Sequence, residues 1–579
     1  MTQRAMPVEH QQTLTNLSLL YVAEGRWAEA YQTCRDALDV GQDIFGVAAS
    51  DAGRQDAVAR GGQLSILATY SALRLGRFDE GLAQLEAGRA RLLAEALALN
   101  DANLEHLKAD ERERLQELRE AVRNYQYEAR LPAGHPARRE ERQIAEELRA
   151  AWAALRAHLA DLRGRYPDFL PEGLALDALL KLIPAGGALV APLFTPQGSA
   201  VFVVPGGTQT LSEEQVIRLD DFTLDNLYAL TRERDGAPGW LGYYIDYRFG
   251  RSGSQALLAG IEDVTGRLWE QLVGPIHAHL KTLGIQQDAP VLIMPQGDSN
   301  RLPLHAAWRI VDGQRRYFMD DYAISYTPSM SALASAKRRT PSGQGALVAG
   351  VSKYPTLGDL PNARAEAEGI AELFKAQALL DDAATVQAVI DGAPGKAFVH
   401  LSCHGGYAWG GDAFASALSL AGEAALPLAA IIAQLDLRAA PLVTLSACET
   451  GIVDVENVPD EFVGLPAAFM QAGARAVISS LWTVEDRSTA LLMERMYQHM
   501  FDAQNPLPPM QALRAAQVWL RSATGAEIGE YYQSFLIPRM SQAEASAAYV
   551  EITIMKGLAP HEKPYERPYY WAAFTYSGV

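Results

Sequence analysis

Two histidines and a cysteine lie within five positions of one another in the segment FVHLSCHGGYAW: His400, Cys403 and His404. A cysteine thiolate is a strong nucleophile, and a histidine can take up or deliver a proton, so this combination is typical of cysteine-based acyl transfer. A further cysteine, Cys448, lies in the segment APLVTLSACETG. The sequence thus offers two cysteines and two histidines from which a nucleophile and its base could come.

The alternation of side chains along a β-strand separates these candidates. Val399, Leu401 and Cys403 share one face of the predicted strand, which indicates that Cys403 is a small buried hydrophobe. His400 and His404 point to the other face, so Cys403 and His404 diverge and make a poor nucleophile–base pair. His400 lies in mid-strand and is expected to be a hydrogen-bonded core residue. His404 precedes two glycines, which end the strand and allow a substrate backbone to approach.

The elements that must position these residues alternate between strands and helices from about residue 175 onward. Strand patterns occupy 186–207 (two strands), 289–297, 345–352, 396–406, 440–451, 474–484 and 569–578. Helical patterns occupy 361–375, 424–436, 461–472, 487–502 and 509–522. This alternation predicts a doubly wound α/β domain with a mostly parallel sheet. In such a sheet the carboxyl ends of the strands meet at one edge, so His404 and Cys448 face each other if their strands are neighbours.

The first third of the chain is helical and repetitive. Residues 20–38 align with residues 71–89 at a constant offset of 51 residues and share the core Gly-Arg-aromatic-x-Glu. This pattern resembles the tetratricopeptide repeat, whose unit is about 34 residues, and the Gly/Ala/Asp-rich segment 41–60 is expected to absorb the extra length. Cys34 falls on an apolar repeat position and is expected to pack in the core. Residues 93–170, with a Pro/Gly break at LPAGHPARRE, predict a long helical hairpin.

Composition excludes several classes of function. The 51 Lys and Arg residues against 69 Asp and Glu give a formal net charge of −18, without the basic footprint of a general nucleic-acid binder. Three cysteines are too few for a disulfide framework or a Cys-based zinc site. No cluster of His, Cys and Asp has metal-ligand spacing, so we expect no catalytic cofactor or metal. The sequence lacks a signal-peptide core and any run of about 18 apolar residues, which predicts a cytoplasmic protein without membrane contact.

Several blocks of the chain, taken in order, resemble the CHAT domain, a caspase- and separase-like (clan CD) cysteine peptidase fold often preceded by tetratricopeptide repeats. The blocks are RLPLHAAW, DYAISYTPSMSAL, LPNARAEAEGIAELF, VHLSCHG, LVTLSACETG, GLPAAFMQAGARAVISSLWTVED and YYWAAF. The expected organisation is repeats over 1–92, the hairpin over 93–170, an N-terminal part of the CHAT region over 171–290, and the peptidase domain over 291–579. The sequence leaves open whether 171–290 is a separate inactive caspase-like half or an extension of the peptidase sheet.

The resemblance implies a catalytic His/Cys dyad. The histidine of the family's His-Gly motif maps onto His404 and the cysteine of its Ser-Ala-Cys motif onto Cys448, whereas Cys403 corresponds to no catalytic position. Cys448 as a thiolate would attack a peptide carbonyl, and His404 would protonate the departing amine. The backbone N–H groups of Gly405 and Cys448 are expected to form the oxyanion hole.

The substrate pocket is expected near the segment SLWTVEDRS, which follows a third predicted strand. This position places Trp482, Glu485 and Asp486 near the dyad, where an acidic residue could select Lys or Arg before the scissile bond. Asp486 could equally cap the helix predicted from residue 487, since Asp is a favoured N-cap, and both interpretations stay open. Glu449, next to the nucleophile, is a further candidate for the pocket or its support.

The sequence therefore predicts a cytoplasmic cysteine endopeptidase that cuts a protein partner at a restricted site. An activating or inhibitory protein partner is expected on the helical repeats, because stacked helix pairs form concave binding faces. The family resemblance implies a role as an effector in bacterial antiviral defence. Two alternatives are a non-catalytic scaffold or adaptor, and a thiol transferase or hydrolase for non-peptide substrates. The presence of both His404 and Cys448 favours the peptidase.

Overall fold

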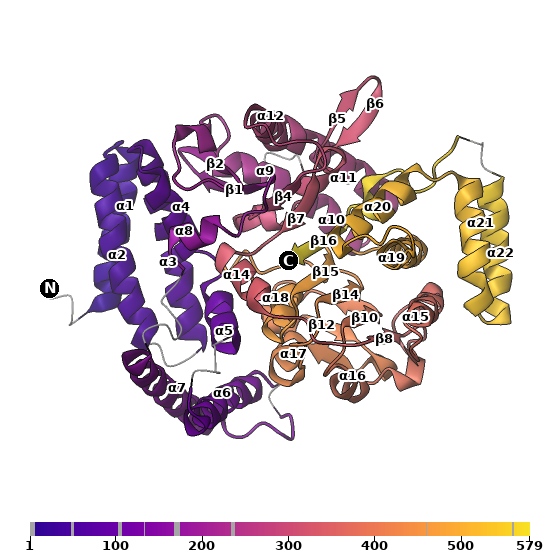
Figure 1. Ribbon diagram of the computed structural model, residues 1–579, viewed down its shortest axis with the longest axis horizontal. Helices are drawn as coiled ribbons and strands as arrows, with labels where there is room; N and C mark the ends of the chain where they lie inside the picture. Colours follow the sequence, from indigo (N-terminus) through magenta and orange to yellow (C-terminus); the bar gives the residue numbers. More distant parts are fainter. Residues whose placement is uncertain are drawn as a thin grey trace.

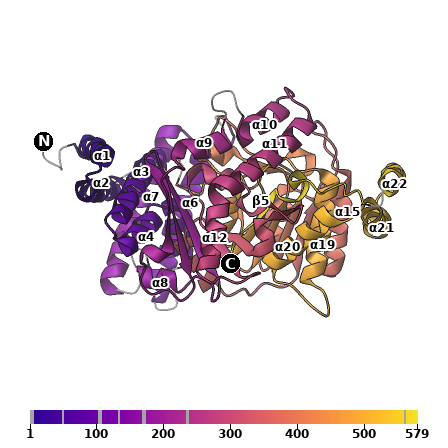
Figure 2. The ribbon, with the colours of Figure 1, turned by 90° about the horizontal axis from the view of Figure 1, so that it is seen from above.

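The computed structural model describes residues 6–47, 51–101, 107–131, 134–166, 174–232, 238–458, 460–557 and 561–579. An all-helical N-terminal region lies along one side of an α/β domain, and a pair of helices projects from the opposite side (Figures 1 and 2). The predicted fold class is confirmed: helices precede an α/β domain built on a large, mostly parallel sheet. No helix in these ranges is long and apolar enough to cross a membrane.

Four helices of the N-terminal region form two consecutive antiparallel pairs. They are α1 (Pro7–Ala23) with α2 (Trp27–Val47), and α3 (Asp51–Arg74) with α4 (Phe78–Ala87). The segment 41–60, expected to absorb extra length between the repeats, is mainly helical: it lengthens α2 to 21 residues and α3 to 24 residues. Residues 48–50 of that segment lie outside the described ranges.

The repeated Gly-Arg-aromatic core is the turn inside each helix pair. Gly25 and Gly76 have φ values of +69° and +73°, a left-handed conformation that glycine adopts without strain and that commonly ends a helix. The N–H groups of Arg26 and Arg77 each bond to the carbonyl five residues earlier at 2.9 Å. The two turns are therefore the same structure, as the sequence alignment predicts. Cys34 is fully buried in the core between the helices.

Helix α5 (Arg91–Asp101) follows the repeats and leads to the predicted hairpin, α6 (Ala109–Arg130) and α7 (Glu141–Arg165). The hairpin has an apolar core of its own, which includes Leu115 and Leu155. Residues 132 and 133 of the predicted break lie outside the described ranges.

One sheet of eleven strands runs through the α/β domain. In spatial order its strands are β3 (Val216–Leu219), β2 (Gly198–Pro205), β1 (Ala188–Thr195), β4 (Pro290–Ile293), β7 (Ala323–Tyr326), β16 (Phe574–Gly578), β15 (Ala476–Ser480), β14 (Leu442–Ser446), β10 (Phe398–Ser402), β8 (Ala346–Gly350) and β9 (Leu379–Leu380). Strands β1, β4, β7 and β16 are mutually parallel, as are the five from β15 to β9, and the two blocks meet antiparallel between β16 and β15. Strands β1–β3 of the predicted 171–290 segment therefore extend the same sheet.

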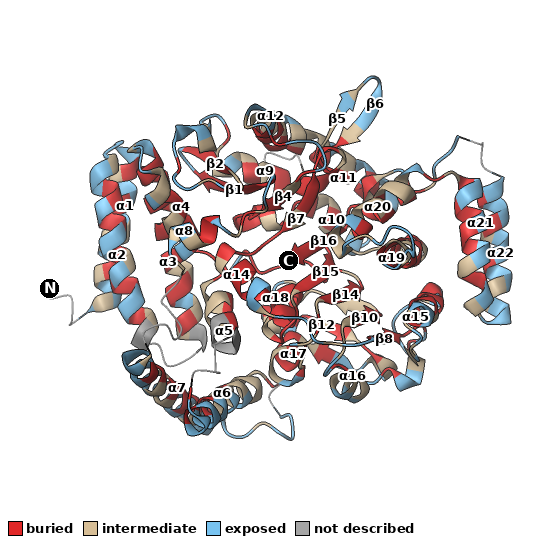
Figure 3. Cartoon of the chain, in the orientation of Figure 1, coloured by how far each residue is buried: buried red, intermediate tan, exposed pale blue. Residues whose placement is uncertain are grey.

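Helices cover both faces of this sheet. On one face lie α15 (Pro361–Leu373), α19 (Asp486–Met500) and α20 (Pro509–Ser522); on the other lie α16 (Val386–Gly392), α17 (Leu428–Gln434) and α18 (Leu465–Gln471). Strands β14 and β15 are buried throughout, and β10 is buried except at Phe398 (Figure 3). Within one strand, Leu347 and Val348 enter different apolar clusters, because successive side chains point to opposite faces.

Strands β10 and β14 are parallel neighbours, with Val399 opposite Val443. Their connection passes through three short strands and then α17. The short strands, β11 (His404–Gly406), β12 (Ala417–Ser419) and β13 (Ala425–Pro427), form a separate antiparallel sheet. Because β10 and β14 run in the same direction, both deliver the residues that follow them to the same edge of the large sheet.

Candidate active site

His404 and Cys448 each lie two residues past the end of neighbouring strands, β10 and β14. Gly405 packs directly on the backbone of Cys448: a Cβ atom at position 405 would lie 2.7 Å from the Cys448 carbonyl oxygen. The same Cβ would lie 3.1 Å from the side chains of Ala447 and Thr450. The structure therefore brings the two predicted dyad residues to the same edge of the sheet, at a contact that only glycine fits without displacement.

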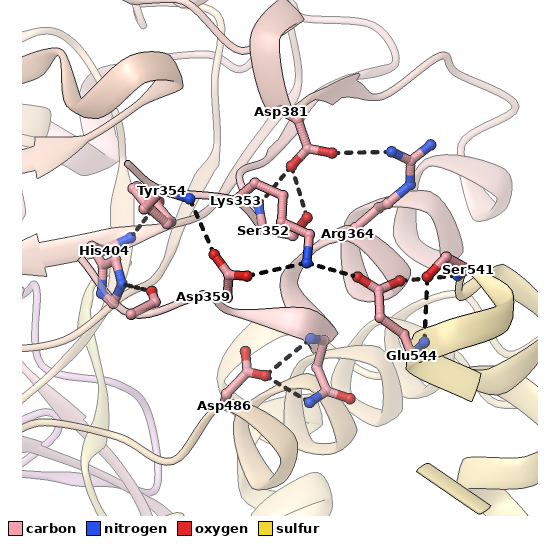
Figure 4. A network of polar contacts seen from close by, with 12 residues as sticks. Ser352, Lys353, Tyr354, Asp359, Arg364, Asp381, His404, Asp486, Ser541 and Glu544 are labelled. Carbon is pink, nitrogen blue, oxygen red and sulfur yellow. Dashed lines mark hydrogen bonds and ion pairs between the residues drawn. The ribbon is translucent and has the colours of Figure 1, made fainter. Parts of the chain in front are cut away.

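The imidazole of His404 is held by the loop that follows β8 (Figure 4). Its Nε2 lies 2.7 Å from the carbonyl oxygen of Gly358. A carbonyl oxygen can only accept, so Nε2 carries the proton and Nδ1 is the basic nitrogen of the neutral ring. The ring lies against Tyr354, with centroids 4.5 Å apart. The Tyr354 hydroxyl accepts the His404 N–H at 3.0 Å and donates to the Ser419 carbonyl at 3.0 Å.

Charged residues anchor this loop on its far side (Figure 4). Asp359 accepts the Tyr354 N–H at 3.3 Å and pairs with the Lys353 ammonium at 3.2 Å. Lys353 also lies 3.5 Å from Glu544 in helix α22 (Gln542–Lys556). The sequence analysis missed Tyr354 and Gly358. A signal existed, because β8 was predicted, and the loop after a strand of a parallel sheet leads to the functional edge.

The thiol of Cys448 is protonated at neutral pH in this structure. Its Sγ lies 3.9 Å from the carbonyl oxygen of Val484, the distance of a weak S–H···O contact. Burial raises the pKa of the Cys448 thiol to about 11, because a desolvated thiolate is unfavourable. Within the described ranges, the backbone N–H of Cys448 has no hydrogen-bond acceptor. The residue is partly exposed, whereas Cys34 and Cys403 are buried.

Glu449 supports the turn that carries Cys448. Its φ is +56°, a left-handed value that is uncommon outside glycine and needs surrounding contacts to hold it. Its buried carboxylate is hydrogen-bonded by four groups: Tyr407 N–H at 2.9 Å, Trp409 Nε1 at 3.3 Å, Arg248 Nε at 3.2 Å and the Tyr244 hydroxyl. Tyr244 and Arg248 both come from helix α10 (Trp240–Arg248). Of the two roles considered for Glu449, these contacts favour support over a pocket open to substrate.

The N-cap of helix α19 (Asp486–Met500) is Glu485 and not Asp486. The Glu485 side chain accepts the Ser488 N–H at 2.7 Å. The N-cap interpretation of Asp486 is therefore wrong. Asp486 instead accepts both the backbone N–H and the side-chain amide of Asn362, at 2.9 and 2.6 Å. Burial raises the pKa of Asp486 to about 7, and its charge contributes to the raised pKa of Cys448.

Trp482 lies behind the site. Its side chain is 0% exposed, and its indole N–H donates to the Tyr569 carbonyl at 3.0 Å. It packs against Trp240 with ring centroids 6.3 Å apart, and its carbonyl accepts the Glu449 N–H at 3.3 Å. The expectation that Trp482 lines the substrate pocket needs correction, because a side chain without exposed surface cannot contact a substrate.

His400 and Cys403, the other candidates in the opening segment, are core residues as the strand alternation predicts. His400 is 0% exposed, and its Nε2 lies 2.8 Å from the carboxylate of Glu366. The Ser402 hydroxyl donates to the same carboxylate at 3.2 Å. Cys403 packs in the apolar cluster on the opposite face, where burial raises the pKa of its thiol far above the usual range.

The edge formed by β10 and β14 thus holds a thiol, an imidazole with a basic Nδ1, and a backbone N–H without an acceptor in the described structure. These groups can act as nucleophile, proton carrier and oxyanion donor in acyl transfer. Among the described residues, no group of three or more His, Cys, Asp or Glu side chains is placed to hold a metal ion.

The sequence profile of the CHAT domain matches residues 262–579. The match spans more than half of the chain, and the chain belongs to the CHAT-domain family. It begins upstream of residue 291, where the sequence analysis placed the start of the peptidase domain. No curated protein matches the sequence.

The comparison with solved structures found matches of low sequence identity. Two crystal structures of the Saccharomyces cerevisiae separase–securin complex are 10% and 11% identical, with TM-scores of 0.41 and 0.37. The alignments cover 85% and 88% of this chain but 36% and 46% of those chains. The crystal structure of the Arg-specific cysteine proteinase gingipain R is 12% identical, with a TM-score of 0.29. Its alignment covers 57% of this chain and 69% of the gingipain chain. The chain thus spans less than half the length of the separase chains that it matches.

Proposed function

We propose that the chain is a cysteine endopeptidase in which Cys448 is the nucleophile and His404 the proton carrier. The observation that carries this proposal is the contact of Gly405 with the Cys448 carbonyl. His404, next to Gly405, and Cys448 follow the ends of two adjoining strands. Membership of the CHAT-domain family supports it.

One proton carrier acts in both steps of the reaction, the formation of the thioester and its hydrolysis. His404 Nδ1 removes the thiol proton as the sulfur of Cys448 bonds to the substrate carbonyl carbon, and the resulting imidazolium delivers that proton to the departing amine. Water then attacks the thioester, with the imidazole again taking the proton and the thiol leaving. The N–H groups of Cys448 and Gly405 stabilise the oxyanion in both steps. The bond from Nε2 to Gly358 keeps Nδ1 available throughout.

Under this proposal the structure represents a resting state of the enzyme, in which the Cys448 thiol is not yet activated. With a thiol pKa of about 11, about one molecule in ten thousand carries a thiolate at pH 7. A signal or protein partner on the helical repeats lowers that pKa by changing the surroundings of Cys448. A latent peptidase of this kind suits the role in antiviral defence that the sequence resemblance implies.

Asp486 is the proposed acid that selects Lys or Arg before the scissile bond. It is half-buried, its charge acts on the Cys448 thiol, and its pKa of about 7 leaves it half ionised at neutral pH. A cationic substrate side chain would favour its charged form. Glu449 supports the same pocket from its buried position, and Glu485 holds the start of α19.

Labelling with peptidyl acyloxymethyl ketones tests the dyad on the purified protein. The probe should label Cys448 slowly, as expected of a resting enzyme, and His404→Ala should slow this labelling by a further factor of about a hundred because the proton carrier is lost. Cys403→Ala is the matched control and should label at the wild-type rate. Equal rates in the His404→Ala variant and the wild type, or labelling at Cys403, would favour the scaffold alternative.

A further inference from the structure

A cavity of about 150 Å³ lies where the helical region meets the α/β domain. Helices α3, α5, α6 and α7 enclose it from one side, and α17, α18 and residues 461–464 from the other. Figure 1 shows α5, α6, α17 and α18 converging at this place. None of the residues of the candidate active site lines the cavity.

The charges on the cavity wall are unbalanced. Four arginines line it, Arg54, Arg119, Arg123 and Arg130, against two carboxylates, Glu95 and Glu461. Both carboxylates are already engaged. Glu95 pairs with Arg54, and Glu461 accepts the N–H groups of Arg91 and Leu92 at 2.7 and 2.9 Å. Neither of these two carboxylates is therefore placed to neutralise Arg123.

Arg123 is the cation for which the described structure provides no partner. Within the described ranges its guanidinium makes no hydrogen bond and no ion pair. The charged groups around it are Glu120, Asp436 and Arg438, and the last two pair with each other. Burial lowers the pKa of Arg123 more than the nearby carboxylates of Glu120 and Asp436 raise it, which reflects the cost of removing a cation from water without a directly paired anion.

The rest of the wall is apolar. Its side chains include Val122, Trp152, Leu155, Phe414, Ile432 and Phe462. A ligand that fits must bury an apolar body against these side chains and present a negative charge to Arg123.

We propose that this cavity binds a small amphipathic carboxylate, with its head on Arg123 and its apolar body against Trp152 and Phe462. An arginine binds a carboxylate through two parallel N–H···O bonds, which suits a partly buried head group. Residues 461–464 belong to the segment that connects Cys448 to α18, so the ligand contacts the same segment as the proposed nucleophile.

Calorimetric titration with decanoate tests the site without any measurement of catalysis. We expect saturable binding near one molecule per chain, weaker binding of decanamide, and no binding of acetate. Arg123→Gln should weaken decanoate binding by at least about tenfold. Arg112→Gln is the matched control, because Arg112 is exposed on the same helix and does not line the cavity.

A second variant guards against misfolding of Arg123→Gln. Ile432→Trp fills the cavity from the opposite wall and should also abolish decanoate binding while the thermal midpoint is retained. The absence of saturable decanoate binding would overturn the proposal. Equal affinity for decanamide, or equal weakening by the Arg123 and Arg112 variants, would do the same. Binding of a Glu-rich peptide in place of decanoate would assign the site to a protein partner and overturn the small-molecule ligand.

Discussion

At the residue scale, the surroundings of Cys448 decide its reactivity. Burial has the largest effect on the thiol, and the nearby carboxylates of Glu449 and Asp486 also disfavour a thiolate. Arg248 acts in the opposite direction, but its guanidinium is already engaged with Glu449. The His404 ring is held in place by Gly358 and Tyr354, whereas the surroundings of Cys448 disfavour its thiolate.

The reactivity of Cys448 toward iodoacetamide should therefore rise with pH. A raised pKa of about 11 means that the thiolate fraction grows about tenfold per pH unit between pH 7 and pH 10. Mass spectrometry of the alkylated protein at each pH measures the rate at each cysteine. Cys34 and Cys403 serve as internal controls, since both are buried and should stay unmodified while the protein is folded. A rate that levels off near pH 8 would contradict the resting-state assignment.

The period of a β-strand was enough to separate Cys403 from His404 and to assign His400 to the core. It could not place Trp482, because burial beyond the end of a strand depends on α10, which lies more than 200 residues earlier in the chain. Nor could it choose the N-cap of α19, because adjacent Glu485 and Asp486 are both acidic. In the structure Glu485 caps the helix, whereas Asp486 accepts hydrogen bonds from Asn362 of another helix.

At the element scale, the ends of β10 and β14 touch through Gly405. Its missing side chain lets the His-Gly turn lie on the Cys448 carbonyl, while the neighbouring Gly406 has open space around its Cα. The two adjacent glycines thus have different roles, one in close contact and one without steric demand.

Gly405→Ala should push the two strand ends apart. A Cβ 2.7 Å from the backbone oxygen of Cys448 forces a backbone shift, which costs about 1–3 kcal/mol of stability and moves His404 away from the thiol. Peptidyl-electrophile labelling of Cys448 and the thermal midpoint measure the two effects. Gly406→Ala is the matched control and should leave both nearly unchanged. If both variants labelled alike, the contact would not position the dyad.

The central strands and helices around the site could be predicted, because long apolar strands and helices have a clear period, whereas strand β7 and the helices between residues 224 and 338 were not predicted. The helices predicted at 361–375 and 509–522 begin where α15 and α20 begin. The strand predicted over 396–406 is divided into β10 and β11, and the helix predicted from residue 424 begins only at Leu428, after β13. Strand β12 was missed, since three residues carry no legible period. The projecting pair, α21 (Gly525–Phe535) and α22, was also missed. Its exposed Val550 and Ile554 blur the contrast between a buried and a solvent face.

At the scale of the whole molecule, buried polar contacts join the helical region to the α/β domain. The Arg89 guanidinium lies 3.5 Å from Asp460 and donates to the Met294 carbonyl at 2.9 Å. Glu86 accepts the N–H groups of Met330 and Ser331 at 2.9 and 2.7 Å, at the start of helix α14 (Met330–Arg338). These partners lie more than 200 residues apart in the chain. They could not be paired from the sequence, because periodicity and spacing describe only residues close together in the chain.

Arg89→Met should destabilise the whole molecule. Both Arg89 and Asp460 are buried, and removing one partner of a buried ion pair costs about 3–5 kcal/mol. Arg77→Met is the control, because Arg77 and Glu80 form a half-exposed pair at 3.8 Å worth about 1 kcal/mol or less. The free energy of unfolding in urea measures both. Similar small losses in the two variants would show that the interface does not depend on this pair.

The central claim, that Cys448 and His404 together cut a protein partner, is tested most directly by mapping new protein N-termini in cells. Cells that carry the wild-type chain should show a small set of cleavage products, with Lys or Arg before the cut if Asp486 selects the substrate. These products should be absent with Cys448→Ala and with His404→Ala, and retained with Cys403→Ala. The same products in the Cys448→Ala cells, or their equal loss with Cys403→Ala, would contradict the account.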